Sequence, residues 1–424
     1  MTLRKSTLYN FIWISAFKLL IEFVYANSIS ENFIMFTFEF NITRYVISWV
    51  LLMFTFIIIN SVNTKTNTRT STLLLYLIYL FSYLPGISLW SLSNLANDFF
   101  IFFNIYWILI LIMMFGYSKV KTPTITIEID ENIKNIMFKA IFLFSAIYGI
   151  YYSYKFSGLR IHFNLLTVYD LRSTDSSAST LEGLLYYIVS TVVYPLFAIY
   201  YYKNRKWLGF IAAVFLELLM FSVAGHKLYF FIIPVGIIAY HFYDDKFFDY
   251  IPRLLSLLVL GGILEQIIMK SGFIVSYFVR RIMYVPALLD SYYYEFFSNN
   301  SPTYFAQDKI LSRLGLTSPY SRPVSRVIGD VYANGSNANT GLFGDAFSNL
   351  GNYSVVIYPV IFLIAMILLD VITNRVSKKY YITVLVSIVM VLLNGEISGI
   401  FYNFILPMSI LFLFMGYISI GKES

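Results

Sequence analysis

Cysteine is absent from this 424-residue sequence, and histidine occurs only three times. Without cysteine the chain has no disulfide framework, no thiolate metal site and no cysteine nucleophile. Three histidines also disfavour a histidine-rich metal site. The function classes that depend on thiols are therefore excluded.

Charge is scarce as well, with 12% charged and 58% hydrophobic residues, whereas soluble domains carry about 25% charged residues. A soluble protein is excluded on this basis. The net charge of +7 is organised by membrane side rather than clustered as a nucleic-acid footprint, so we expect no nucleic-acid partner. The 37 Tyr suit a bilayer surface, because one end of the side chain is apolar and the other bonds water.

Long apolar runs recur along the whole chain, and a helix needs about 20 such residues to cross a bilayer. The sequence therefore predicts an all-α polytopic integral membrane protein, a single membrane domain over 1–424 with about twelve transmembrane helices. Membrane lipids are its surroundings. The predicted spans are 8–25, 45–62, 72–92, 99–117, 136–154, 184–202, 207–223, 228–243, 254–269, 353–373, 380–394 and 400–420.

The Lys/Arg distribution sets the orientation. With the N-terminus inside, sixteen basic residues fall in cytoplasmic segments, while the short outside loops hold only Arg44 and Lys227. Both termini are then cytoplasmic. Lys18 and Glu22 are spaced to pair on one helix face, which favours an uncleaved first span over a signal peptide.

Two outside segments, 155–183 and 270–352, exceed ordinary loop lengths, which predicts structure and function there. Residues 273–298 are too apolar for a solvated loop and contain Pro286. We expect two interfacial helices separated at this proline. Residues 329–352 carry five Gly and five Asn, which predicts a turn-rich stretch before the tenth span.

Eight of the twelve outside basic residues are Arg, against five of sixteen inside. Because guanidinium offers a rigid fork that matches phosphate oxygens, this difference predicts recognition of an oxyanion. Binding to lipid headgroups is the alternative for any single Arg. Arg280-Arg281, beside a predicted interfacial helix, is the strongest pair.

Nine outside carboxylates are candidates for a general base. Asp345 and Asp330 are our first choices because glycines flank them. The first outside loop has no Asp/Glu-x-Asp pair to hold a divalent cation, so we expect no metal and no cofactor, and Arg and Lys would stabilise a diphosphate leaving group. The nine are Asp170, Asp175, Glu182, Asp290, Glu295, Asp308, Asp330, Asp345 and Glu396.

Sugar contacts are a further expectation for the aromatic run 292–297 and for the loop amides. Interfacial anchoring is the alternative for the aromatic residues. Within the spans Glu217 and Glu265 are unpaired acids, for which proton binding and a structural role both stay open. The amides are Asn334, Asn337, Asn339 and Asn349.

In plan and motifs the chain resembles the Wzy-type O-antigen polymerases, over most of its length. Four sequence elements are similar to elements of that family, and Arg313 with Gly329 fits an Arg-x15-Gly pattern discussed for some members. The four are Tyr169-x2-Arg172, Gly225-His226-Lys227, Arg280-Arg281-x4-Pro286-x5-Tyr292-Tyr293-x2-Phe296-Phe297, and Asn339-Thr340-Gly341-x2-Gly344-Asp345-x3-Asn349-x-Gly351.

The resemblance implies a GT-C-like inverting glycosyltransferase in the bacterial inner membrane, with its active site facing the periplasm. It would join oligosaccharide repeat units carried on undecaprenyl diphosphate. Implied catalytic residues are Asp345, Asp330, Arg280 and Arg281. Implied substrate contacts are Arg172, Lys227, His226, Tyr292, Tyr293, Glu295, Asn349 and Arg313.

Two alternatives stay open at this point. An O-antigen ligase would share the fold and the donor but transfer to lipid A core. A flippase or transporter of lipid-linked oligosaccharides has a similar number of spans, although the long outside loop argues against it. Whether a polysaccharide chain-length regulator docks on the protein is open too.

Overall fold

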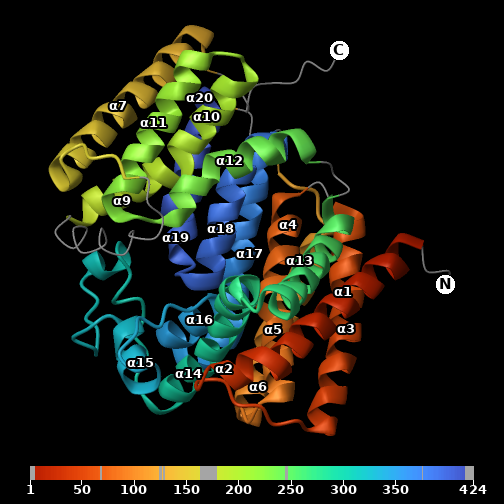
Figure 1. Ribbon diagram of the computed structural model, residues 1–424. Helices are drawn as coiled ribbons and strands as arrows, with labels where there is room; N and C mark the ends of the chain where they lie inside the picture. The colour runs from red at the N-terminus through yellow and green to blue at the C-terminus, as the bar shows by residue number, and fades with distance from the viewer. Residues whose placement is uncertain are drawn as a thin grey trace. The chain divides into compact units, whose positions relative to one another are not determined.

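The computed structural model describes residues 5–66, 69–123, 127, 129–162, 179–243, 247–374 and 376–415. Throughout these residues the regular structure is helical, and no strand occurs among them (Figure 1). The chain divides into two compact units. Unit 1 comprises Met1–Lys121, Asp244–Met366 and Val391–Ile397, and unit 2 comprises Thr122–Tyr243, Ile367–Met390 and Ser398–Ser424.

Nine helical segments of the described chain are long and apolar enough to cross a membrane. The other three predicted spans coincide with shorter apolar helices, Lys227–Phe242, Ile382–Asn394 and Ser398–Phe414. The chain is therefore an all-helical, polytopic membrane protein. The nine are Thr7–Asn32, Ile42–Thr64, Thr70–Leu92, Asn97–Tyr117, Glu131–Ser157, Thr180–Lys203, Trp207–Ala224, Asp249–Met269 and Leu342–Thr373.

Unit 1 is built on long apolar helices that pack in pairs. Helix α1 contacts α13, and α3 contacts both α5 and α6. Two π-helical turns, η1 (Tyr25–Ile29) and η2 (Tyr79–Tyr83), lie among these helices, which are α1 (Lys5–Val24), α2 (Ser30–Asn32), α3 (Ile42–Thr66), α4 (Thr70–Ile78), α5 (Leu84–Leu92), α6 (Asn97–Tyr117) and α13 (Phe247–Met269).

The predicted outside segment 270–352 forms the remainder of unit 1 together with the start of α17 (Ser354–Thr373) and residues Val391–Ile397. It consists of helices η5 (Val275–Tyr284), α14 (Val285–Asn299), η6 (Leu311–Leu314), α15 (Val324–Tyr332), α16 (Leu342–Leu350) and η7 (Gly351–Tyr353). Helix α14 packs against α16 and α15. The stretch expected to be turn-rich thus includes a helix, α16, whose buried residues face the core.

Unit 2 places α11 (Trp207–Ala224) against α7 (Glu131–Ser157) and α10 (Tyr194–Lys203) (Figure 1). Side-chain caps fix two starts: Asp130 accepts from the N–H groups of Asn132 and Ile133, and Ser179 opens α9 with a capping box. The other helices are α9 (Thr180–Ile188), η4 (Val189–Val193), α12 (Lys227–Phe242), η8 (Lys378–Tyr380), α19 (Ser398–Ile400), η9 (Phe401–Ile405), α20 (Leu406–Phe414), and α18 (Ile382–Asn394) up to Met390.

Four π-helical stretches, η2, η4, η5 and η9, each end two residues before a proline: Pro85, Pro195, Pro286 and Pro407. A proline lacks the N–H group for the helical ladder and its ring crowds the preceding carbonyl. The wider π turn accommodates that missing bond without breaking the helix. The chain is therefore helical from 273 to 299, and the predicted separation at Pro286 is a change of helix type.

Lys18 and Glu22 form an ion pair on α1, as their spacing predicts, and both side chains are buried. The Lys18 ammonium also donates to the Ser48 hydroxyl at 3.0 Å and lies over the Trp49 ring at 4.6 Å. Burial of both charges inside one apolar helix is tolerable because each has a partner. The pair therefore links two successive turns of α1.

Candidate functional site

A polar cavity of about 390 Å³ lies within unit 1. Its walls combine hydroxyl, amide and aromatic groups with two carboxylates and one guanidinium, a mixture suited to a hydroxyl-rich ligand. The lining comes from α14, from residues 307–325, from α16 with the turn before it, and from the turn after α18. The lining residues are Tyr293, Gln307, Ser318, Tyr320, Ser321, Arg322, Pro323, Val324, Ser325, Asn339, Thr340, Asp345, Ser348, Asn394, Gly395 and Glu396.

Asp345 lies in the first turn of α16 and is buried at the cavity. Its Oδ1 accepts from the Asn349 amide at 2.9 Å, and its Oδ2 accepts from the N–H group of Ile397 at 2.9 Å. The Asn349 Oδ1 in turn accepts from the Thr303 hydroxyl at 2.7 Å and from the N–H group of Phe305 at 3.0 Å. Both oxygens of the Asp345 carboxylate are thus hydrogen-bonded, and the bond to Ile397 fixes the backbone next to Glu396.

Glu396 is exposed within the cavity, and no hydrogen bond to its carboxylate occurs among the described residues. The surrounding protein atoms raise the pKa of its carboxyl above the ordinary value, Asp308 raises that pKa further, and Lys309 lowers it. Glu396 is therefore the accessible acid–base group of the cavity.

Glycines allow the backbone of α16 to approach its neighbours. A Cβ added at Gly341 would lie 2.8 Å from the carbonyl oxygens of Leu392 and Leu393, on the segment that leads to Glu396. A Cβ added at Gly344 would lie 2.4 Å from the Thr340 hydroxyl. The Asn339–Gly351 element is thus the packing motif that brings Asp345 to the cavity.

Asp290 on α14 is the buried anchor of this arrangement. Its Oδ1 accepts from the Thr340 hydroxyl at 2.8 Å and from the N–H group of Gly344 at 3.0 Å. Burial raises the pKa of the Asp290 carboxyl to about 7, although these two hydrogen bonds lower it. Asp290 therefore joins α14 to α16 and does not line the cavity.

Arg322 is the cationic residue of the cavity lining. Its guanidinium donates to the Asp330 carboxylate on α15 at 2.5 Å, and both side chains are partly exposed. Asp330, one of the two predicted bases, is not part of the lining. Asp330 forms an ion pair with Arg322 instead.

Other predicted contacts surround the cavity unevenly. Tyr293 lines it, and its buried hydroxyl donates to the carbonyl of Ala338 at 2.8 Å. Tyr292 stacks on Tyr332 with ring centroids 5.0 Å apart. Glu295 and Arg313 are exposed, and neither residue lines the cavity. Of these residues, only Tyr293 faces the same cavity as Asp345.

Arg280 and Arg281 lie in η5, at the other end of the helix that carries Tyr293. The twelve residues from Arg281 to Tyr293 span roughly 15–20 Å of helix. The Arg280 guanidinium lies over the Phe33 ring at 4.0 Å and donates to the Ser276 hydroxyl at 3.3 Å. The structure therefore does not bring this pair into the cavity of Asp345.

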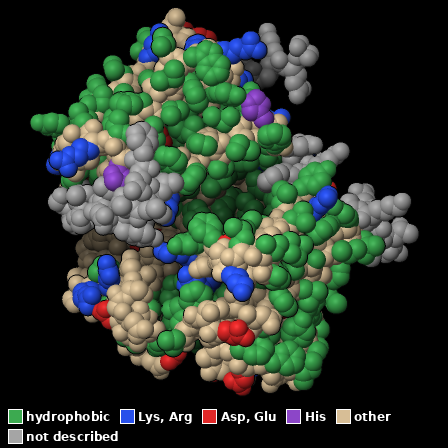
Figure 2. Space-filling model, in the orientation of Figure 1, with side chains coloured by type: hydrophobic (Ala, Val, Ile, Leu, Met, Phe, Trp, Pro, Cys, Tyr) green, Lys and Arg blue, Asp and Glu red, His purple; other side chains and the backbone are tan. Residues whose placement is uncertain are grey.

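Phe33 and Ser276 line a second cavity of about 580 Å³ in unit 1, which also includes Lys270. Figure 2 shows Lys and Arg side chains gathered over the end of α13 and η5. Glu265, an intramembrane acid in the sequence, accepts from the N–H groups of Phe273 and Ile274 at 2.9 Å and so caps the following helix. Its role here is structural.

The remaining predicted residues fall in unit 2 or outside the described residues. Lys227 begins α12, and the His226 ring lies 5.3 Å from that of Tyr229. Arg172 lies outside the described residues, as do Asp170 and Asp175.

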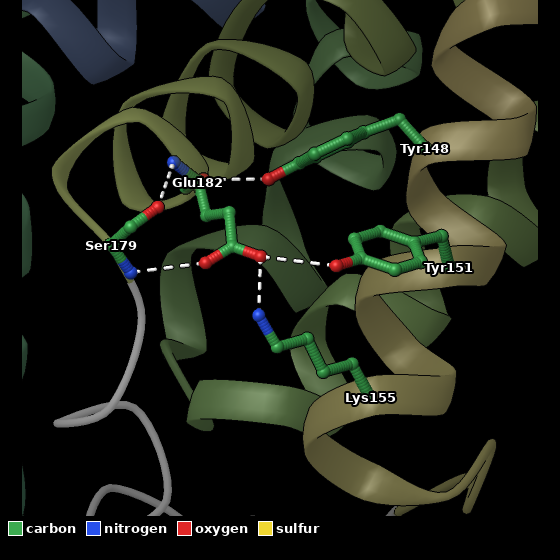
Figure 3. A network of polar contacts seen from close by, with 5 residues as sticks. All are labelled: Tyr148, Tyr151, Lys155, Ser179 and Glu182. Carbon is green, nitrogen blue, oxygen red and sulfur yellow. Dashed lines mark hydrogen bonds and ion pairs between the residues drawn. The ribbon is translucent and has the colours of Figure 1, made fainter.

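Figure 3 shows the polar network that joins α7 to α9. The Glu182 carboxylate accepts from the Lys155 ammonium at 2.5 Å and from the Tyr151 hydroxyl at 3.2 Å, while the Tyr148 hydroxyl donates to the Glu182 carbonyl at 2.6 Å. Ser179 completes the network through the capping box. Glu182 is thereby committed to joining two helices.

Sequence reasoning counted Glu396 among nine candidate bases without selecting it, and it gave no individual role to Arg322 or Thr340. Glu396 carries a signal, since Asn394-Gly395-Glu396 is a polar turn directly after an apolar helix. Within the described residues no group of three or more metal-ligating side chains occurs. Comparisons with protein-family models, with curated proteins and with solved structures found no match.

Proposed function

We propose that this chain is a membrane glycosyltransferase that joins saccharides carried on a polyprenyl diphosphate, and that the cavity of Asp345 and Glu396 is its sugar site. The observation that supports this proposal is the set of side chains that line the cavity. An accessible carboxylate, a held carboxylate and a guanidinium meet there among tyrosine rings and amide groups. Hydroxyl-rich ligands bind through these side-chain types.

The reaction follows from these groups. An acceptor hydroxyl oxygen attacks the anomeric carbon of the donor sugar, and the bond from that carbon to the diphosphate oxygen breaks with inversion. The electron pair leaves with the diphosphate, and the proton passes to the Glu396 carboxylate as general base. Asp345 is a positioning residue, because it holds the N–H group of Ile397 beside Glu396.

Helix-end contacts support the twelve-span topology, and the Lys/Arg distribution is the basis for proposing that both termini are cytoplasmic. The lining residues come from segment 270–352 and from the turn after the eleventh predicted span, which the topology places outside together. On the predicted inner side Asn10 donates to Asp249 at 2.7 Å, and Arg69 donates to the carbonyl of Tyr117 at 3.1 Å. Each contact joins segments that the topology assigns to one side.

The narrower proposal is an O-antigen polymerase of the bacterial inner membrane, acting on undecaprenyl-diphosphate-linked repeat units at the periplasmic face. It rests on the Arg280–Phe297 and Asn339–Gly351 elements. Asn339, Thr340 and Asp345 of the Asn339–Gly351 element line the cavity. Arg280 and Arg281, near the second cavity, are proposed to contact the diphosphate of the acceptor's lipid carrier, away from the donor diphosphate in the sugar site.

Lipopolysaccharide profiles of a deletion strain test this proposal. A band of core plus one repeat unit, restored to a ladder by the wild-type chain but not by Glu396→Gln at equal expression, supports a polymerase. Bare core with polymer accumulating on the lipid carrier outside indicates a ligase. Repeat units trapped inside indicate a flippase.

A further inference from the structure

The backbone around Arg322 is held by hydrogen bonds, whereas its side chain is exposed and makes one ion pair. The Gln307 amide donates to the carbonyl of Arg322 at 2.9 Å, and the Gln307 Oε1 accepts from the N–H group of Val324 at 2.8 Å. The Arg322 side chain is 59% exposed, and its guanidinium contacts the Asp330 carboxylate. The side chain can therefore change partner while the chain around it stays in place.

The cavity lining carries both signs of charge. Arg322 is an exposed residue of this lining, whereas Asp345 is buried. Glu396 shares the segment that Asp345 holds. A ligand that fits this lining carries an anionic group toward Arg322 and uncharged hydroxyl groups toward the carboxylates. A uniformly anionic ligand would face the two carboxylates and be repelled.

The pair between Arg322 and Asp330 is suited to exchange. Exposed ion pairs are weak because water screens them and ordering two side chains costs entropy. A phosphate group offers guanidinium a forked, doubly charged partner and so competes well with a single carboxylate. Asp330 is also positioned on α15, outside the lining, where it can release Arg322 without reshaping the cavity.

We infer that Arg322 is the anion-binding group of this cavity, that Asp330 occupies it in the ligand-free protein, and that the ligand is a saccharide bearing a phosphate or diphosphate group, which displaces Asp330. The saccharide part of this inference rests on the proposed function. The anion site does not. Asp330 thus sets the affinity of the site and is not its base.

Calorimetric titration of inorganic diphosphate into the purified full-length protein in detergent tests the anion site. Asp330→Asn removes the competitor and is expected to tighten binding about two- to fivefold, the value of an exposed ion pair. Arg322→Gln is expected to weaken binding at least tenfold, since hydrogen bonds to charged groups are the strong ones. Arg326→Gln, an exposed arginine on α15 outside the lining, is the matched control for loss of charge.

The double variant Asp330→Asn/Arg322→Gln distinguishes competition from a general change in charge. Competition requires that Asp330→Asn have no effect once Arg322 is gone. Additive effects, or an Asp330→Asn protein that binds diphosphate no better than wild type, would overturn the inference. Unchanged thermal unfolding of each variant excludes misfolding as the cause of a lost signal.

The two proposals fail separately. A protein that binds diphosphate through Arg322 but forms no glycosidic product contradicts the proposed function alone. An active transferase whose diphosphate binding is insensitive to Asp330 and Arg322 contradicts the anion site alone.

Discussion

The Asp345 carboxylate accepts a hydrogen bond from the N–H group of Ile397 at 2.9 Å, between residues 52 positions apart in the sequence. This bond joins α16 to the turn after α18 and fixes the residue that follows Glu396. The two carboxylates therefore have different roles. Asp345 is committed to holding the backbone, and Glu396 is free to exchange a proton with a ligand.

Glu396→Gln is predicted to lower kcat about 10²- to 10⁴-fold with little change in KM, because an amide cannot accept the proton of the acceptor hydroxyl. Steady-state kinetics in proteoliposomes check this. Glu39→Gln, at an exposed position outside the cavity lining, is the control. A Glu396→Gln enzyme with wild-type kcat would rule out a general-base role.

Asp345→Asn is predicted to lower kcat less than Glu396→Gln and to make the protein easier to unfold. The amide can keep one acceptor oxygen but places an N–H group against another donor, either that of Asn349 or that of Ile397. A buried donor without an acceptor costs about 1–3 kcal/mol. Thermal unfolding of the variant beside its kinetics separates the two effects, and an unfolding curve identical to wild type would contradict the holding role.

Asp290 predicts a pH dependence of stability. Its folded-state pKa, about 7, lies above the ordinary aspartate value, so between pH 4 and 7 the folded protein binds more protons than the unfolded chain. Stability therefore falls as pH rises through this window, by up to about 4 kcal/mol from this group. Asp290→Asn keeps an acceptor for Thr340 and Gly344 and should flatten the curve. Denaturation in detergent between pH 4.5 and 8 measures it, and equal slopes for both proteins would refute the assignment.

Gly341→Ala is predicted to destabilise the protein by about 1–3 kcal/mol, since its Cβ meets two backbone carbonyls that cannot rotate away. Gly183→Ala in α9, where an added Cβ meets no atom within 4 Å, is the matched control and should be neutral or slightly stabilising. Melting temperatures compare the two. Equal melting temperatures would show that α16 does not need the close approach.

Arg280→Ala and Arg281→Ala should differ in stability. Arg280 lies over Phe33, a contact worth about 0.5–1 kcal/mol, whereas Arg281 is exposed. Only the first variant should therefore melt at a lower temperature. If both lower transfer to the same extent despite this difference, the loss belongs to ligand binding, as the proposed diphosphate contact requires.

The helices of this protein follow from its hydropathy, because each apolar run must be helical to satisfy its backbone groups in lipid. Even so, Pro286 was expected to separate two helices, and only the structure shows that a π turn accommodates it. The cavity is less accessible to sequence reasoning. Asp345 could be selected from its glycine-flanked motif. The polar turn of Glu396 is visible in the sequence, but only the structure shows that the turn before α16 lies against residues 392–397. Asp330 has the same glycine-rich surroundings as Asp345 and pairs with Arg322 instead.

The most direct test of the central claim is transfer by the purified protein in proteoliposomes supplied with a polyprenyl-diphosphate-linked oligosaccharide. The wild-type protein should form a ladder of longer saccharides and release one polyprenyl diphosphate for each bond formed. Folded Glu396→Gln protein should form neither. A wild-type protein that forms no glycosidic bond, or a Glu396→Gln protein that makes the full ladder, would contradict the account.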